Sequence, residues 1–195
     1  MLTHPRKSTQ QVQASATTAA TTTRTPGRVI RSATPADLQY VYQLQNRLHR
    51  LVGYTPKGGL VDRIDSHRMI IVEENGDPAG YVTFTHRRDG RTHLPQIAVD
   101  PHIWNTKAGT ELMTRLVADA NHVGSYAITL KSAIDLDVNT WWGQHGFKPQ
   151  HVEQTNRRTL VHWAKRLRPS DPHPILAPQR HRPPGGIRQR ATTTT

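Results

Sequence analysis

Hydrophobic periodicity is confined to the middle of this 195-residue chain, between residues 28 and 168. Residues 1–27 contain eight Thr, three basic residues and no acid, and residues 169–195 contain six Pro and four Arg. Neither end has enough apolar surface to offset the entropy lost on ordering. The sequence therefore predicts one domain, residues 28–168, with room for a real core, between two disordered basic tails.

Charge and residue content exclude several classes of protein. The formal net charge is +12, but it is spread over both ends and the middle, so no single nucleic-acid stripe is indicated and only a weak contact of the tails with a polyanion is expected. The chain has no Cys, which excludes a disulfide framework, a thiolate metal ligand and a Cys nucleophile. The histidines show no metal-ligand spacing, and no apolar run is as long as a membrane span. We therefore expect neither a metal site nor membrane insertion.

The start of the chain bears on where the protein is located. No apolar stretch follows the first charges, so a secretory signal is not expected. The acid-free beginning, with its Ser, Thr and Arg, has the composition of an organelle transit peptide but lacks an amphipathic face. A cytoplasmic location is expected, with organelle import as the minor alternative.

Apolar runs and turn signals predict the order of elements in the middle segment. Thr34 is the N-cap of the first helix, and Gly53 ends that helix. The turn signals Asn75-Gly76 and Asp89-Gly90 join three strands into an antiparallel meander. In chain order we expect a strand at 28–31, a helix at 34–53, a short helix within 54–67, strands at 69–72, 79–85 and 92–99, a helix at 106–121, a strand at 126–130, a short helix after Asp137, and strands at 147–153 and 158–165.

The stretch that follows Val99 carries the clearest functional signal. A strand ends there, Pro101 breaks it, and a long amphipathic helix begins after a short loop. Such a loop brings free backbone N–H groups and the positive end of a helix together, which suits a pyrophosphate. Asn105, Thr106 and Lys107 add donors and one charge. Every helix N-terminus has spare N–H groups, so an ordinary helix start is the alternative interpretation of this pattern alone.

The spacing of this stretch resembles motif A of the GNAT superfamily, the Gcn5-related N-acetyltransferases. That motif is a strand ending in Val-x-Pro, two residues, and then Arg/Gln-x-x-Gly-x-Gly/Ala at the start of a helix. Val99, Pro101 and Gly109 match it, and downstream Gly146 and Phe147 match the family's Asn-x-x-Ala-x-x-x-Tyr-x-x-x-Gly-Phe. The resemblance covers about residues 28–165, so only the tails lie outside it.

The resemblance implies an α/β (α+β) fold, with a mixed, mostly antiparallel central sheet of about six to seven strands flanked by about four helices. It also implies an N-acetyltransferase that uses acetyl-CoA, with no metal, to acetylate a primary amine of a small molecule or a protein by direct attack. The loop backbone would hold the coenzyme A pyrophosphate, and the preceding strand would bind the pantetheine arm and polarise the thioester carbonyl. The implied coenzyme-binding residues are Ile97, Ala98, Val99, Trp104, Asn105, Thr106, Lys107, Ala108, Gly109, Thr110, Asp135 and Trp142.

Four positions depart from the family pattern. Trp104 replaces the Arg or Gln, Lys107 the first Gly, Asp135 the Asn, and Trp142 the Tyr that often donates a proton to the leaving thiolate. Lys has a Cβ that hinders close approach of the backbone, and an indole is no useful acid near neutral pH. These changes leave open a second interpretation, a catalytically inactive GNAT-like fold that serves as a binding or structural module in a larger assembly.

Two histidines are the candidate catalytic residues of the implied reaction. His93 lies close to the implied pantetheine-binding strand and is a candidate base, with His86 as the other candidate and Gln96 as a holder of water. His145, three residues after Trp142, is a candidate substitute acid. The alternative is that these histidines only line a polar sheet face. The acceptor and the oligomeric state have no signature in the sequence.

Overall fold

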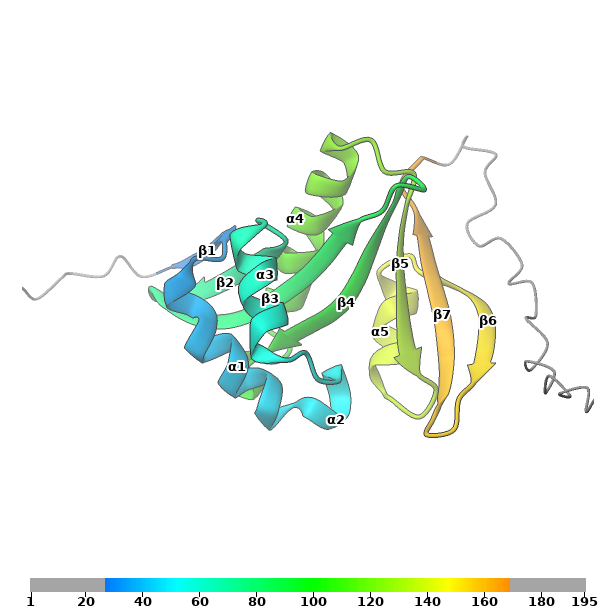
Figure 1. The fold of residues 1–195 in the computed structure, drawn as a ribbon, viewed down its shortest axis with the longest axis horizontal. Helices are drawn as coiled ribbons and strands as arrows, with labels where there is room; N and C mark the ends of the chain where they lie inside the picture. The colour runs from blue at the N-terminus through cyan, green and yellow to red at the C-terminus, as the bar shows by residue number, and fades with distance from the viewer. Residues whose placement is uncertain (1–26, 169–195) are drawn as a thin grey trace, which may run out of the picture.

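Seven strands form one sheet in the described part of the computed structural model, residues 27–168 (Figure 1). The strands are β1 (Arg28–Ser32), β2 (Met69–Glu74), β3 (Asp77–His86), β4 (Arg91–Val99), β5 (Ala127–Ala133), β6 (Lys148–Gln154) and β7 (Thr159–Arg166). Their spatial order is β1-β2-β3-β4-β5-β7-β6, and every neighbouring pair is antiparallel except β4 and β5, which are parallel. The predicted mixed, mostly antiparallel sheet is therefore confirmed. The predicted tails lie outside the described residues, apart from Gly27.

Helices cover both faces of this sheet. One face carries α1 (Leu38–Arg47), α2 (His49–Val52) and α3 (Lys57–Asp65), and the other carries α4 (Ala108–His122) and α5 (Val138–Gln144). Two 3₁₀ turns, η1 (Pro35–Asp37) and η2 (Pro101–Ile103), precede α1 and follow β4. Each face has its own apolar core. Leu44 and Leu60 lie in the core under α1 and α3, and Leu112 and Leu116 lie in the core under α4.

The first predicted helix is interrupted in the structure. Leu48 has φ −105° and ψ 15°, which ends α1 and starts the four-residue α2. Val41 and Leu44 of the predicted apolar stripe are fully buried, whereas Leu51 lies beyond the break and is 48% exposed. Helical spacing of leucines continues through the break, so the sequence pattern alone does not reveal it.

The parallel pair β4–β5 is short, and this positions the site. Only Arg91 to His93 pair with Ala127 to Thr129, after which β4 continues to Val99 and β5 to Ala133 without pairing to each other. Figure 1 shows the two strands moving apart from this point. Next to the separation, a register shift between Thr83 and Thr85 places a bulge in the β3–β4 pair. Bulges bend a strand and re-aim its side chains, which suits the edge of an opening.

Gly80 on β3 tests how tightly β3 and β4 pack. A Cβ at this position would lie 2.8 Å from the carbonyl oxygen of Ala98 and 3.1 Å from the Cα of Val99. Because backbone atoms cannot move aside cheaply, we expect Gly80→Ala to lower the free energy of unfolding by about 1–3 kcal/mol. Gly58→Ala on α3 is the control, since nothing lies within 4 Å of its Cβ position. Denaturant titration compares the two variants, and equal effects would contradict the packing.

Candidate active site

The turn between β4 and α4 has an unusual backbone. Asn105 (φ 64°) and Lys107 (φ 70°, ψ 2°) both occupy the left-handed region, and Lys107 is the residue directly before α4. This conformation costs an L residue with a Cβ roughly 1–2 kcal/mol and is free for Gly. Lys107 stands where the resembling motif has its first Gly. The turn therefore has a conformation that Gly adopts freely, with a Lys at that position.

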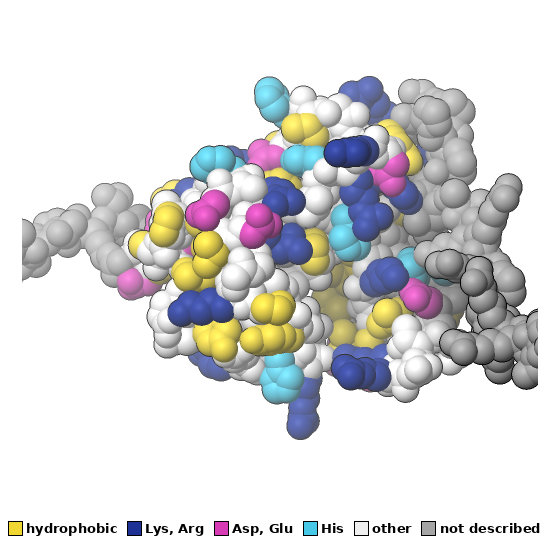
Figure 2. Space-filling view, in the orientation of Figure 1, with side chains coloured by type: hydrophobic (Ala, Val, Ile, Leu, Met, Phe, Trp, Pro, Cys, Tyr) yellow, Lys and Arg dark blue, Asp and Glu magenta, His cyan; other side chains and the backbone are white. Residues whose placement is uncertain are grey.

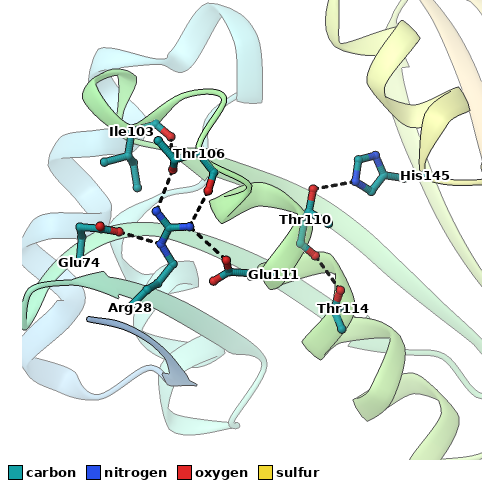
Figure 3. Close-up of polar contacts among 8 residues, drawn as sticks. All are labelled: Arg28, Glu74, Ile103, Thr106, Thr110, Glu111, Thr114 and His145. Carbon is teal, nitrogen blue, oxygen red and sulfur yellow. Dashed lines mark hydrogen bonds and ion pairs between the residues drawn. The ribbon is translucent and has the colours of Figure 1, made fainter. Parts of the chain in front are cut away.

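Arg28 of β1 holds this turn in place (Figure 3). Its Nη1 donates to the carbonyl of Thr106 at 2.7 Å, and its Nη2 donates to the Thr106 hydroxyl at 2.8 Å. The same guanidinium pairs with Glu74 of β2 at 2.7 Å and with Glu111 in the first turn of α4 at 3.1 Å. A rigid planar donor that joins β1, β2, the turn and the helix fixes the shape that Lys107 alone disfavours.

The N-terminus of α4 is not capped by a side chain. Lys107, the N-cap residue, makes no side-chain cap hydrogen bond, while the amide of Glu111 is already bonded to the Lys107 carbonyl. The Thr106 hydroxyl donates back to the Ile103 carbonyl, so this predicted donor is used within the turn. The amides of the first turn, at residues 108–110, are thus the donors that this end offers to an anion.

Trp104 folds back over the end of β4. Its side chain is 50% exposed, and its indole Nε1 donates to the carbonyl of Val99 at 2.8 Å. Of the predicted strand residues, Ala98 is buried under α1, whereas Ile97 and Val99 pack against the core under α4. Side chains of this strand therefore serve both cores, and only its backbone is free to meet a ligand in the opening between β4 and β5.

A histidine and a tryptophan connect α5 to the start of α4. The indole of Trp141 lies 3.3 Å from the position of a Cβ on Gly109, and the His145 ring stacks on it with centroids 3.8 Å apart. His145 Nε2 lies 2.9 Å from the hydroxyl of Thr110, and its Nδ1 lies 2.9 Å from the carbonyl of Trp141. A carbonyl only accepts, so Nδ1 carries the proton and Nε2 accepts from Thr110. A neutral His145 therefore has no proton to give from Nε2.

Beside this contact lies a small pocket of about 170 Å³. It is lined by residues of α4, the end of α5 and β7, namely Thr110, Met113, Thr114, Val117, His145 and Lys165. Gly109 presents its Cβ side to Trp141 and not to the open end of the helix. A substitution at Gly109 would therefore report helix packing as much as phosphate binding.

Two of the predicted coenzyme contacts have side chains that are already engaged within the protein. Trp142 is 4% exposed and packs edge-on against Phe147 in the core, so its indole does not face a ligand surface. Asp135 is exposed, and both its carboxylate oxygens accept from Nη2 of Arg158, at 2.9 and 3.0 Å. The other ten predicted contacts, on β4, in the turn and at the start of α4, cluster as expected and stay predictions.

His93 lies where β4 and β5 separate. It belongs to the last β4–β5 pair, and its Nδ1 is 3.5 Å from the hydroxyl of Thr129. Thr85, directly opposite His93 on β3, lies within reach of Arg63 of α3, so the His93 ring is on the α1–α3 face. Burial, together with the positive charges of Arg87, Lys131 and Arg63, lowers the pKa of His93 to about 4. His93 is therefore neutral at physiological pH.

The other residues of the predicted proton path lie apart from His93. His86 is hydrogen-bonded to Thr92 at 2.8 Å, and Thr92 to Ser125 at 2.8 Å, which puts His86 on the α4 face. Gln96 is 4% exposed, and its amide donates to Gln45 of α1 at 3.0 Å. Protein atoms already use this amide, so the expectation that Gln96 holds a water is not supported. His93 and His145 lie on opposite faces of the sheet and do not form one catalytic pair.

A metal-binding group and a membrane-spanning helix are both absent from the described residues. Between residues 27 and 168, no three His, Cys, Asp or Glu side chains are grouped so that they would hold a metal ion. In the same part of the chain, no helix is both long enough and apolar enough to cross a bilayer.

The strand pair that separates and the uncapped helix turn lie where the sequence motif placed the strand, the loop and the helix start. The profile described as the acetyltransferase (GNAT) family matches residues 38–141, more than half of the chain. The protein belongs to the GNAT acetyltransferase family, and the predicted family and fold are confirmed. No curated protein matches the chain.

Solved structures of GNAT proteins share the fold. Ribosomal-protein-S18-alanine N-acetyltransferase from Escherichia coli has a TM-score of 0.62 at 16% identity, over 79% of this chain and 98% of that one. The protein yncA from Salmonella typhimurium, solved with acetyl-CoA, has a TM-score of 0.62 at 17% identity, over 75% and 95%. N-acetylglutamate synthase from Neisseria gonorrhoeae, solved with coenzyme A and N-acetyl-glutamate, has a TM-score of 0.65 at 17% identity, over 74% of this chain but only 36% of its own. At these identities the likeness carries the fold alone.

Sequence reasoning missed Arg28 as a residue of the site. Its contacts with Thr106 join positions 78 residues apart, and nothing in the pattern of β1 announces them. The sequence reveals only that an Arg begins the first strand. Which of the adjacent residues Trp141 and Trp142 faces the core depends on the phase of α5, which the sequence pattern does not fix.

Lys107→Gly tests whether the turn is held against a local backbone preference. Removing the Cβ relieves the left-handed strain, although Gly adds entropy to the unfolded chain, so we expect a net gain of about 0.5–1 kcal/mol in the free energy of unfolding. Lys107→Ala is the control because it removes the same charge and keeps the Cβ. Thermal and denaturant unfolding measure both. Equal stability of the two variants would show that the backbone at Lys107 is not strained.

The pKa of His93 predicts an acid-dependent loss of stability. An unfolded His binds a proton near pH 6.5, whereas folded His93 does so only near pH 4. As pH falls from about 6.5 to about 4, the unfolded chain gains a proton first, so the free energy of unfolding drops within this window. His93→Gln removes this contribution, and we expect its stability to fall less than that of the wild type over the same window. Parallel curves in urea titrations would contradict the assignment.

Proposed function

We propose that this protein transfers an acetyl group from acetyl-CoA to a primary amine by direct attack. The observation that carries the proposal is the separation of β4 from β5 after His93 and Thr129, beside a left-handed turn at the N-terminus of α4. The separation leaves strand amides without a strand partner, and the turn offers helix amides to an anion. These are the two donor sets that a thioester with a pyrophosphate requires.

The residues divide into two groups in the proposed complex. The backbone amides of residues 108–110 would bind the pyrophosphate, with Lys107 as the nearest positive charge and Arg28 holding the turn. The backbone of Ile97, Ala98 and Val99 would bind the pantetheine arm and stabilise negative charge on the carbonyl oxygen. Acetyl-CoA supplies the activated acyl group. The amine nitrogen bonds to the carbonyl carbon while the carbon–sulfur bond breaks.

The amine must lose a proton, and His93 is placed to take it. Its ring is on the α1–α3 face at the inner end of the opening and is neutral at physiological pH. A base with a pKa of about 4 accelerates the reaction less than a base whose pKa lies near neutrality. We therefore expect its rate acceleration to lie at the low end of the usual range for a general base, about 100-fold. Departure of the thiolate needs no strong acid, because a thiol has a pKa of about 8.5.

A binding or structural module of the same fold is the second candidate function. It is favoured by Trp141 and His145, which bridge α4 and α5 beside Gly109, and by Trp142, which is buried where the family has a tyrosine acid. Such a module would have lost turnover and kept the fold. Coenzyme binding and turnover therefore have to be measured separately.

Calorimetric titration with acetyl-CoA, followed by a free-thiol assay with a panel of amines, separates the two candidates. We expect a dissociation constant in the micromolar range, about −8 kcal/mol, and thiol release that depends on the amine. We expect Lys107→Glu to weaken acetyl-CoA about ten-fold or more, since it reverses the charge beside the pyrophosphate. Lys57→Glu, at the start of α3, is the matched control. No binding at millimolar acetyl-CoA would rule out the transferase, and binding without turnover would favour the module.

His93→Gln tests the proton acceptor. We expect kcat/KM for the amine to fall about 100-fold with little change in acetyl-CoA affinity. His86→Gln is the control, since His86 lies on the opposite face, against Thr92. Because the pKa of His93 is about 4, the pH–rate profile of the wild type should show no inflection from this group above pH 5. Wild-type kcat/KM in the His93 variant would remove it from the reaction.

A further inference from the structure

The α1–α3 face of the sheet has a positively charged opening where β4 and β5 separate. Figure 2 shows a hollow between the part of the molecule with α1–α3 and the part with β5–β7, and Lys and Arg side chains lie around it. His93 and Thr129 form its inner end. Lys131 is two residues further along β5, so its side chain is on the same face as that of Thr129.

Arg63 reaches this opening from α3. Its Nη1 lies 3.4 Å from the hydroxyl of Thr85, the residue opposite His93 in the β3–β4 pair. Within residues 27–168 no carboxylate forms an ion pair with Arg63, since neighbouring Asp62 pairs with Arg68 at 2.8 Å. Burial lowers the pKa of Arg63, the charge of Arg68 lowers it further, and the charge of Asp62 opposes this shift. A half-buried guanidinium without a counter-ion is unfavourable, and a bound anion would relieve it.

Arg87 and Lys131 extend the positive charge around His93. Arg87 follows β3 and, in the described part of the chain, pairs with no carboxylate. Lys131 pairs with Glu153 of β6 at 2.8 Å, and that carboxylate is shared with His162 at 2.6 Å. Together with Arg63, these residues put three cations, from α3, the β3–β4 turn and β5, near one neutral ring. Among residues 27–168, only Lys131 of the three forms an ion pair with a carboxylate, while Asp62 and Asp89 act on Arg63 and Arg87 from further away.

The outer end of the opening is bridged. Arg158, in the turn between β6 and β7, donates to the carbonyl of Arg50 on α2 at 3.0 Å and to Asp135 after β5 at 2.9 Å. Since α2 packs against β4 through the Gln96–Val52 contact, this arginine joins the two sides of the opening beyond the separated strands. A bridged opening suits a small molecule better than an extended polymer.

We propose that the acetyl acceptor is a small primary amine that carries an anionic group, a carboxylate or a phosphate, bound by Arg63 and Arg87. This inference rests on the proposed function and names its substrate class. Arg63 offers paired N–H donors that match either anion, and the anion replaces the missing counter-ion. The amine end then points past His93 into the opening. Polyamines are disfavoured, because like charges across a binding site repel each other.

Matched amines test the substrate class with the full-length chain at saturating acetyl-CoA. β-Alanine against β-alaninamide isolates the carboxylate, and O-phosphoethanolamine against ethanolamine isolates the phosphate. We expect kcat/KM to be about ten-fold or more higher for the anionic member of at least one pair, and spermidine to be the poorest acceptor. Equal or better rates for the neutral or cationic amines would overturn the inference and leave the proposed transferase standing.

Arg63→Gln identifies the anion-binding residue. We expect the KM of the preferred anionic amine to rise about ten-fold, while the dissociation constant of acetyl-CoA is unchanged. Arg115→Gln is the matched control, because Arg115 lies on α4, on the other face of the sheet, and is paired with Asp119 at 2.9 Å. An unchanged KM in Arg63→Gln would contradict the assignment.

A direct measurement of amine binding distinguishes failure of this inference from failure of the proposed transferase function. Binding of β-alanine and O-phosphoethanolamine is followed by NMR with coenzyme A present, in the wild type and in Arg63→Gln. Anion-dependent binding that the variant loses supports the inference even if turnover is slow. Absence of such binding overturns it, whereas failure of acetyl-CoA itself to bind overturns the proposed function instead.

Discussion

The separation of β4 from β5 after three residue pairs is the constraint on which the rest of the structure depends. Two parallel strands that stop pairing leave a row of backbone groups without partners, and such groups normally find them. The opening persists because each strand is held on its other side, β4 by β3 and β5 by β7. Gln96 adds a buried tie between β4 and α1 through Gln45. The two strands that border the opening are therefore each held in place from the side away from it.

The guanidinium of Arg28 stabilises the left-handed turn at Lys107, a conformation that Gly adopts freely. Lys107 gives the turn a charge near the proposed pyrophosphate but a costly backbone, and Arg28 fixes the turn through Thr106. Glu74 and Glu111 both pair with Arg28, and two carboxylates against one guanidinium mean that Arg28 shapes the turn without adding positive charge there. The contacts of β1 with the turn and with α4 therefore fix the shape of the turn. A substitution in β1 would change the proposed coenzyme site.

Sequence patterns predicted the strand ends to within three residues, and also the turn before α4, because periodicity and Gly-containing turns are local signals. Features that depend on contacts between distant parts of the sequence could not be predicted. The faces of His93 and His86 depend on strand pairing and on the bulge beside Thr85, and neither is visible in the chain. The burial of Trp142 instead of Trp141 depends on the phase of α5. Arg28 became part of the site only through a contact across 78 residues.

A net charge of +12 states how many cations the chain has, not where they lack partners. On the α4 side, Arg28 is fully paired, so anion binding there is proposed to fall to backbone amides and Lys107. On the α1–α3 side, Arg63 forms no ion pair with a carboxylate among residues 27–168 and lies partly out of water, where a charge interacts more strongly with its surroundings. An uncompensated charge at that position destabilises the empty protein and is relieved by an anion. The pairing of charges, more than their number, therefore distinguishes a binding face from a solvated surface.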